Sequence, residues 1–221
     1  MPMPICLYCG CDLHRNQPIL YFYLQQDQLC NACRNQLHPI NHTITIEQLQ
    51  VHGLYCFNEF YRSLILQYKE CMDEVLADVF LSIFKEELRK KYRHCLFVPA
   101  PSSSQKMTLR GFDHVHLLFQ NIGIKIQSCF IKTDDIKQDF QSKQNRASIG
   151  DKIELVTIPD LGKKVILIDD VCTTGSTLLA MHRLFLNQGI KAEACVVAIH
   201  PLLLPQNGKI RQIKSLYLDK K

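Results

Sequence analysis

The chain has 221 residues, of which 47% are hydrophobic and 21% charged, a composition that is typical of a folded globular protein and excludes a largely disordered one. No apolar run reaches the roughly 18 residues that a membrane-spanning helix needs, and the first residues lack the basic and apolar regions of a secretory signal, so we expect a cytoplasmic protein. The formal net charge of +5 comes from the part after residue 95, where 17 Lys and Arg stand against 11 Asp and Glu, a surplus compatible with a polyanionic partner.

The first 40 residues contain two C-x-x-C pairs, Cys6 with Cys9 and Cys30 with Cys33. Two such pairs can supply the four thiolates of a structural Zn²⁺ site, and the metal would organise a segment too short to bury a core of its own. Cys11 and His14 are alternative ligands without the paired spacing, and a redox C-x-x-C is the competing interpretation. We therefore predict a small four-cysteine zinc-finger domain with its linker over residues 1–50 and a second domain over residues 51–221.

The rest of the chain alternates between strand-like and helix-like segments. Helical periodicity runs from residue 60 to 92, with a break near Lys69-Glu70-Cys71, and a polar stretch without periodicity covers residues 133–152. We predict strands at 51–57, 95–101, 125–131, 165–168 and 192–199, and helices from about 108 to 121 and at 176–188. This alternation predicts an α/β domain with a mostly parallel sheet.

Two acids and a hydroxyl-rich turn follow the apolar residues 165–168. Asp169 and Asp170 would stand at the carboxyl end of a parallel strand, where ligands collect in such sheets. The turn Thr173-Thr174-Gly175-Ser176-Thr177 opens a helix, whose free N–H groups suit a phosphate, while carboxylates suit sugar hydroxyls or a Mg²⁺ carried by the ligand. The pattern indicates a sugar phosphate. A simple helix cap would need one acid only, and no Walker-type nucleotide loop is present.

V-I-L-I-D-D-V-C-T-T-G-S-T (165–177) resembles the motif by which type I phosphoribosyltransferases bind phosphoribosyl pyrophosphate (PRPP). The resemblance implies that Asp169 and Asp170 meet the ribose hydroxyls and that Thr173 to Thr177 wrap the 5′-phosphate. It also implies a pyrophosphate loop at 98–104, which includes Ser102, and a closing loop at 133–152, with Lys143 and Arg146 as candidate contacts. The competing interpretation of both cations is a solvated loop.

The cysteine pairs ahead of this motif resemble the ComF family. Y-R-S-L-I-L-Q-Y-K (61–69) and R-G-F-D-H (110–114) are similar to family segments, and the resemblance makes Lys69 and Arg110 candidate contacts for the pyrophosphate or the acceptor. The competing interpretation of each is a surface ion pair. The chain departs from the family's pattern at Asp113 and His114, where the family usually has Asn and Gln. Further departures occur in the closing loop at Gln141 and Ile149.

The ComF resemblance implies a role in natural transformation, in which single-stranded DNA enters the cytoplasm through the inner membrane. It implies PRPP with Mg²⁺ as ligand, single-stranded DNA and membrane DNA-uptake or helicase-type competence proteins as partners, and a place at the inner face of the inner membrane. It leaves open whether a transfer to an acceptor is catalysed. Two alternatives stand: a single-stranded nucleic-acid binder with a regulatory or vestigial PRPP site, and a base-salvage phosphoribosyltransferase.

Overall fold

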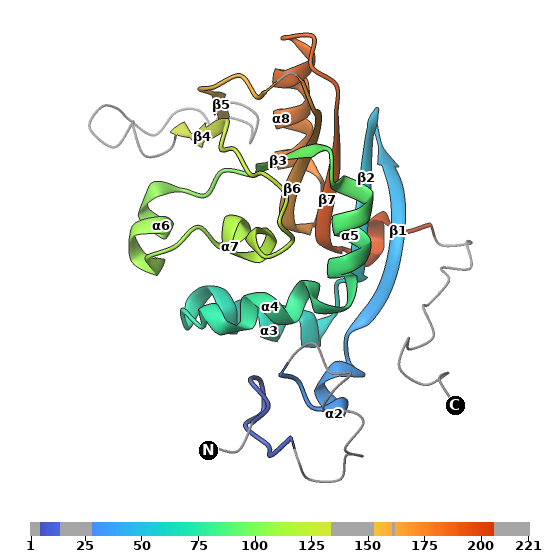
Figure 1. Cartoon of the computed structure of the whole chain (residues 1–221), viewed down its shortest axis with the longest axis vertical. Coiled ribbons are helices and arrows are strands. Elements are labelled where there is room, and N and C mark those ends of the chain that lie inside the picture. The colour runs from blue at the N-terminus through green and yellow to red at the C-terminus, as the bar shows by residue number, and fades with distance from the viewer. Residues whose placement is uncertain (1–4, 14–27, 134–152, 161, 206–221) are drawn as a thin grey trace.

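A five-stranded sheet in the order β1-β2-β7-β6-β3 runs through the computed structural model, which describes residues 5–13, 28–133, 153–160 and 162–205 (Figure 1). Strands β2, β7, β6 and β3 are parallel, and β1 pairs antiparallel with β2 at one edge. A separate antiparallel pair is formed by β4 and β5. The strands are β1 (His38–Ile46), β2 (Leu49–Cys56), β3 (Cys95–Pro99), β4 (Phe130–Lys132), β5 (Ile153–Leu155), β6 (Lys164–Cys172) and β7 (Ala192–Ile199).

Helices cover both faces of this sheet, as the parallel strand order requires. The helical segments are α2 (Asn31–Arg34), α3 (Glu59–Glu70), η1 (Glu74–Leu76), α4 (Ala77–Leu81), η2 (Ser82–Phe84), α5 (Lys85–Tyr92), α6 (Ser104–Arg110), α7 (His114–Gln120), α8 (Ser176–Leu186) and η5 (Pro201–Leu203). Helices α3, α4, α5 and α7 pack against one face and α8 against the other. The predicted α/β class with a mainly parallel sheet is confirmed.

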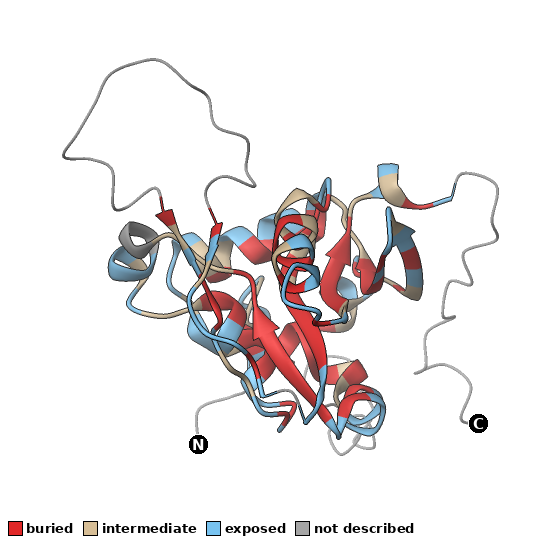
Figure 2. Ribbon diagram, turned by 90° about the horizontal axis from the view of Figure 1, so that it is seen from above, coloured by how far each residue is buried: buried red, intermediate tan, exposed pale blue. Residues whose placement is uncertain are grey.

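Strand β6, which lies between β7 and β3, shows how the two cores divide. Ile166 and Ile168 pack with the core under α3, α4 and α7, whereas Val165 and Leu167 pack with the core under α8. Successive side chains of a strand point to opposite faces, and both faces here are covered, so these strand residues are apolar throughout rather than alternating. Figure 2 shows the buried strands between the helical layers.

Several sequence predictions need correction. The strand predicted at 125–131 is wrong: only Phe130–Lys132 is a strand, and Ile126 forms a single isolated bridge with Phe97. The helix predicted from about 108 to 121 is two helices, because Gly111 has φ +80° and the Asp113 side chain accepts the N–H groups that open α7. The expected break near residue 70 is confirmed, since α3 ends at Glu70.

Strand β1 has no counterpart among the predicted elements. Its residues pair with β2 from His38 opposite Cys56 to Ile46 opposite Leu49, so part of the segment 1–50 is hydrogen-bonded into the main sheet. The proposed domain division between residues 50 and 51 therefore falls inside β2. Within the described ranges, no helix combines the length and apolar character that crossing a bilayer requires.

Candidate functional site

The two adjacent acids lie within β6, not after its end. Strand β3 pairs with β6 only as far as Ile168, whereas β7 stays paired to Cys172. The strand predicted at 165–168 is therefore too short. On one side, Asp169 and Asp170 lie in the part of β6 that is still paired with β7. On the other side they lie beyond Ile168, the last residue of β6 that pairs with β3, so their carboxylates lie next to the gap where β3 has ended.

The two carboxylates have different surroundings because neighbouring side chains of a strand point to opposite faces. Asp170 lies on the face covered by α3 and α7. Its Oδ2 accepts from Lys69 Nζ on α3, and its Oδ1 is 3.7 Å from His114 Nε2 on α7. Its backbone carbonyl also accepts from the buried Tyr61 hydroxyl at 3.3 Å. Asp169 Oδ1 accepts only from the backbone N–H of Asp170, at 2.9 Å, among the bonds of the described residues.

His114 connects this acid to the loop after β3. Its Nδ1 is 3.1 Å from Ser102 Oγ and 3.4 Å from an Arg110 guanidinium nitrogen. A guanidinium can only donate, so this contact favours Nδ1 as an acceptor and Nε2 as the protonated nitrogen that faces Asp170. The Tyr68 hydroxyl donates to the His114 carbonyl at 2.7 Å and fixes the start of α7.

These surroundings separate the acids electrostatically. Burial raises the pKa of Asp169 well above its ordinary value, and the neighbouring charge of Asp170 raises it further. Burial would also raise the pKa of Asp170, but the hydrogen bond from His114 and the charge of Lys69 outweigh it and place that pKa below its usual range. Burial lowers the pKa of His114. Asp170 is therefore the carboxylate that holds its charge.

The turn after β6 has the geometry of an anion site. Gly175 has φ +77° and is the N-cap of α8, so it adopts a conformation that favours glycine. A Cβ at this position would lie 2.8 Å from Ile46 Cδ1 on β1. Thr174 Oγ1 accepts the Ser176 backbone N–H at 3.3 Å and lies 2.8 Å from the Ser176 hydroxyl. The turn surrounds a small hollow of about 30 Å³ lined by Asp169, Val171, Cys172, Thr173, Thr174, Gly175, Ser176, Thr177 and Leu178.

A second hollow of about 200 Å³ adjoins it and is cationic. It contains three basic side chains, Lys69, Arg110 and Lys132, together with the loop after β3. Its lining is Lys69, Ala100, Pro101, Ser102, Ser103, Arg110, His114, Val115, Lys132, Asp169, Asp170 and Thr177. Asp169 and Thr177 line both hollows, whereas Asp170 lines only the cationic one. The two hollows thus meet at Asp169.

The structure brings most of the predicted site residues together. Lys69, Arg110 and Ser102 reach the cationic hollow from α3, α6 and the loop after β3. Arg110 also bonds Glu70 at 2.9 Å, so it takes part in an ion pair as well. Arg146 and Lys143 lie outside the described residues. Among the residues that the prediction left out are His114, Lys132 and Tyr61. His114 was visible as a departure in the R-G-F-D-H segment and Tyr61 opens the Y-R-S-L-I-L-Q-Y-K segment, whereas nothing local marked Lys132.

The four predicted zinc ligands form one cluster. The sulfur atoms of Cys6, Cys9, Cys30 and Cys33 all lie within 4.8 Å of one another. Four thiolates about 2.3 Å from a tetrahedral Zn²⁺ would be about 3.8 Å apart, and Cys9 Sγ and Cys30 Sγ are 3.8 Å apart. The Cys33 N–H donates to Cys30 Sγ at 3.4 Å, a hydrogen bond that stabilises a thiolate. The donor set therefore fits a metal ion, and Cys11 is an exposed neighbour.

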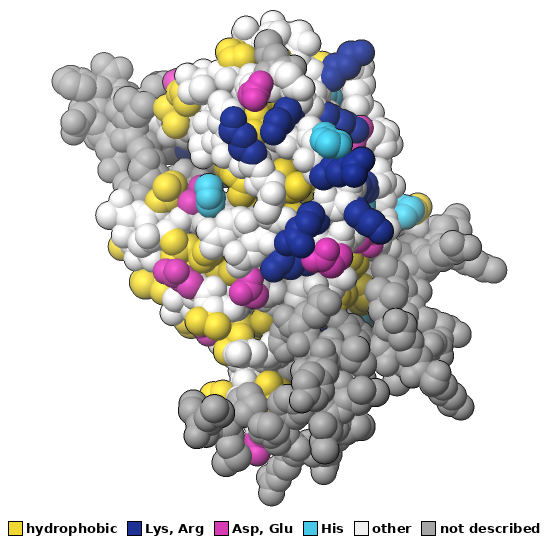
Figure 3. Space-filling model, viewed as in Figure 1, with side chains coloured by type: hydrophobic (Ala, Val, Ile, Leu, Met, Phe, Trp, Pro, Cys, Tyr) yellow, Lys and Arg dark blue, Asp and Glu magenta, His cyan; other side chains and the backbone are white. Residues whose placement is uncertain are grey.

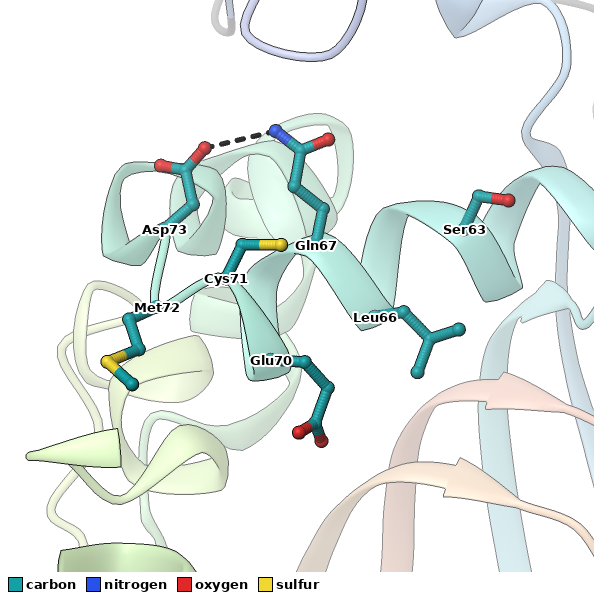
Figure 4. Close-up of a pocket in the computed structure, with 7 residues that line it drawn as sticks. All are labelled: Ser63, Leu66, Gln67, Glu70, Cys71, Met72 and Asp73. Atoms are coloured by element: carbon teal, nitrogen blue, oxygen red, sulfur yellow. Dashed lines mark hydrogen bonds between the residues drawn. The ribbon is translucent and has the colours of Figure 1, made fainter. Parts of the chain in front are cut away.

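A larger, open hollow of about 910 Å³ lies at the end of α3 (Figure 4). It is lined by Ser63, Leu66, Gln67, Glu70, Cys71, Met72 and Asp73. Gln67 Nε2 donates to Asp73 Oδ2 at 3.1 Å, and no Lys, Arg or His of the described residues lines it. This hollow lacks the cations that a phosphorylated ligand needs, so the adjoining pair of hollows around Asp169 is the better candidate site.

The match to known families agrees with this geometry. Residues 124–215 match the family model described as the phosphoribosyl transferase domain. This match includes the two acids and the turn of residues 173–177, and it covers less than half of the 221 residues.

Two curated proteins, each named Competence protein ComFC, are similar to the chain. The one from Streptococcus pneumoniae is 31% identical over 144 residues, which are 63% of this chain and 63% of the relative. The one from Bacillus subtilis is 25% identical over 217 residues, which are 84% of this chain and 90% of the relative. The chain thus spans less than two thirds of the first relative. These similarities confirm the predicted resemblance to ComF proteins.

Among solved structures, an adenine phosphoribosyltransferase from Saccharomyces cerevisiae is similar, at 15% sequence identity and a TM-score of 0.40. The alignment covers 78% of this chain and 88% of the chain in that structure. A similarity at this level supports no statement about the ligand.

Proposed function

We propose that the chain binds PRPP with Mg²⁺ in the two adjoining hollows. The 5′-phosphate would accept from the turn of Thr173 to Thr177, the ribose hydroxyls would donate to the paired acids, and the pyrophosphate would lie among the cations of the second hollow. The observation that carries this proposal is the junction at Asp169, because a phosphate site and a cationic site meet at an acid that suits the sugar between them.

The cationic hollow also suits a transfer reaction. In such a reaction the bond between the ribose C1 and the pyrophosphate oxygen breaks, a bond from C1 to a nitrogen of the acceptor forms, and the pyrophosphate leaves with its electron pair. Lys69, Arg110 and Lys132 would stabilise that negative charge. Mg²⁺ prefers phosphate oxygens and water, so it would travel with the pyrophosphate. The four-cysteine cluster would hold Zn²⁺ as a structural ion.

Thermal unfolding tests the ligand. A hundredfold excess of PRPP over its Kd stabilises a protein by about 2.7 kcal/mol, so PRPP with Mg²⁺ is expected to raise Tm by several degrees. The variant carrying both Asp169→Ala and Asp170→Ala should show no such rise. Absence of a PRPP effect on the parent protein would contradict the proposal. Turnover of PRPP with a free nucleobase would instead favour a salvage enzyme.

The names of the two curated relatives support a role in competence. We place the protein in natural transformation, where it would support the entry of single-stranded DNA into the cytoplasm at the inner face of the inner membrane, together with DNA-uptake and helicase-type competence proteins. A cell that carries the double aspartate variant should then transform at a lower frequency than its parent. An unchanged frequency would show that the PRPP site is dispensable for uptake.

Direct DNA binding is a second candidate function. It is favoured by a basic surface at the amino ends of the parallel strands. Arg93 precedes β3, Lys163 and Lys164 flank the start of β6, and Lys191 precedes β7; all are exposed at the amino ends of adjacent parallel strands. Figure 3 shows Lys and Arg side chains gathered on the face around α5. One nearby acid pairs with part of this charge, Glu193 with Lys164 at 2.5 Å.

Single-stranded DNA binding at this basic surface should weaken steeply with salt. The variants Arg93→Glu and Lys163→Glu should weaken it further, whereas Arg62→Glu, an exposed change on α3, should not. Binding that is equally weak for all three variants would place the DNA elsewhere.

A further inference from the structure

The open hollow at the end of α3 exposes large apolar side chains. Leu66 and Met72 line it and are 46% and 54% exposed. Met72 also has φ +56°, a backbone conformation that residues with a side chain rarely adopt. Figure 4 shows Leu66 on the last turns of α3 and Met72 in the bend that follows. The volume of about 910 Å³ has room for several side chains of another segment.

The lining of this hollow is also acidic. Glu70 and Asp73 belong to it, and the exposed Glu74 follows. Glu70 binds Arg110 through Oε1 only. Asp73 binds Gln67 through Oδ2 only. The second oxygen of each carboxylate has no partner among the described residues, so each acid can accept from a cation and keep its present bond. The hollow therefore suits an occupant that is both apolar and basic.

Residues 206–221, the basic segment, combine these two properties and lie outside the described residues. The segment has five Lys and Arg against one Asp. Its apolar residues are Ile210, Ile213, Leu216, Tyr217 and Leu218. We propose that the basic segment docks in the open hollow at the end of α3, with its apolar side chains on the exposed apolar lining and its cations beside the two acids.

The basic segment is long enough to reach this hollow. The Phe57 N–H donates to the Ile199 carbonyl at 2.8 Å, so the chain leaves β7 beside the residues that begin α3. Helix α3 has 12 residues and is about 18 Å long. Residues 200–205 add at most about 20 Å to the path, whereas the 16 residues of the basic segment span about 50 Å when extended.

The other two long stretches outside the described residues lack a surplus of positive charge. Residues 14–27 contain one Arg and one Asp, and residues 134–152 contain four Lys and Arg against four Asp. A segment without net charge gains no electrostatic attraction from an acidic lining. Charge complementarity therefore favours the basic segment as the occupant.

Cys71 supplies a probe of the docked state, because it lines the hollow and is exposed when the described residues are taken alone. Alkylation of the folded full chain by iodoacetamide, followed by peptide mass spectrometry, gives the rate at each cysteine. The double variant Ile213→Asp with Leu216→Asp should raise the rate at Cys71 about tenfold, the effect of losing one well-buried apolar side chain from a contact. The exposed Cys11 should react equally in both proteins. Equal rates at Cys71 would overturn the proposal.

Substitutions in the hollow give a matched pair. Leu66→Asp should also speed the reaction of Cys71, whereas Leu186→Asp, which changes an exposed residue on α8, should not. The double variant Lys209→Glu with Lys214→Glu should have the same effect as Leu66→Asp. High salt should speed the reaction in the parent protein, because ion pairs near the surface are screened. A rate that responds neither to salt nor to the charge reversal would contradict the role of the acids.

A disulfide test decides whether the occupant belongs to the same chain. In Leu216→Cys, mild oxidation should join the new thiol to Cys71 of the same chain, at a rate that does not depend on protein concentration. Leu186→Cys serves as the control and should not form this bond. Linked dimers whose yield rises with concentration would assign the hollow to a second copy and overturn the proposal. Failure of both Leu216→Cys and Ile213→Cys to bond with Cys71 would overturn it as well.

Discussion

Lys69 on α3 forms an ion pair with Asp170 on β6, across 101 positions of the chain. The pair joins the helical layer to the strand that carries the candidate site. Asp169, the preceding residue on that strand, has no such ion pair with a cation of the described residues. Of these two neighbouring acids, Asp170 thus has its negative charge balanced by a cation, and Asp169 does not. Their substitutions should therefore have opposite effects on stability.

Asp170→Asn should destabilise the protein and Asp169→Asn should stabilise it. Breaking a buried ion pair from one side costs about 3 kcal/mol, because it leaves the other charge buried without its partner. Asp169 carries a pKa raised by burial and by Asp170, so ionising it at neutral pH costs folding free energy. Removing it should therefore raise the free energy of unfolding. Urea unfolding at pH 7 measures both changes.

The sign for Asp169 can also be checked against pH. A carboxyl whose folded pKa is raised contributes stability that is present below its unfolded pKa and is lost as the pH rises through the folded pKa. The stability gained by Asp169→Asn should therefore be larger at pH 8 than at pH 5. A gain that is independent of pH would assign it to packing rather than to charge.

Gly175→Ala should weaken phosphate binding and lower the stability. The residue has φ +77°, and its new Cβ would lie 2.8 Å from Ile46 Cδ1. The matched control is Gly189→Ala, where φ is +72° but no described atom lies within 4 Å of the Cβ. Both variants should lose about 1 kcal/mol to backbone strain, and Gly175→Ala should lose more because of the contact with β1. Equal losses would mean that Ile46 moves aside freely.

The sequence predicted the residues of the phosphate turn better than their relation to the acids. The order Asp169, Asp170, then Thr173 to Thr177 is local, so its chemistry could be deduced from residue types alone. The partners Lys69 and His114 lie on other helices, and their meeting at Asp170 depends on how α3 and α7 pack on the sheet. No spacing within one segment encodes that contact.

The missed strand β1 has a similar cause. His38–Ile46 contains Pro39 and Asn41, which has φ +43°, and its burial pattern does not alternate. An edge strand pairs on one side only and tolerates such residues, so its sequence carries little of the usual strand signal. The error at 125–131 has the opposite cause: Ile126 packs against the core but forms only an isolated bridge with Phe97.

Cys30→Ser should release the metal that we assign to the four-cysteine cluster. A site built from four cysteines needs all four thiolates for tetrahedral binding, and the metal stands in for a core in this short segment. Native mass spectrometry should show one Zn²⁺ per chain in the parent protein and none in Cys30→Ser. Cys11→Ser, which changes an exposed neighbour outside the cluster, should keep the metal. Loss of Zn²⁺ from Cys11→Ser would show that Cys11 is a ligand.

His52 should make the protein less stable in acid. It is buried, its Nε2 is 2.6 Å from Asn41 Oδ1, and its Nδ1 is 3.1 Å from the Tyr92 hydroxyl. Burial lowers the pKa of His52 from 6.5 to about 4, helped by the charge of Lys91. A histidine whose folded pKa is depressed contributes stability that is present above its unfolded pKa and is lost as the pH falls through the folded value.

The expected loss between pH 6.5 and pH 4 is about 3 kcal/mol, since each pKa unit corresponds to about 1.4 kcal/mol. His52→Gln keeps a side-chain amide in this place and cannot titrate there, so its unfolding free energy should fall less over the same interval. His114 is present in both proteins, so its own titration cancels in the comparison, and His116→Gln serves as the exposed control. Urea unfolding at several pH values gives the two curves. Parallel curves for the parent and His52→Gln would show that His52 takes no part in the acid sensitivity.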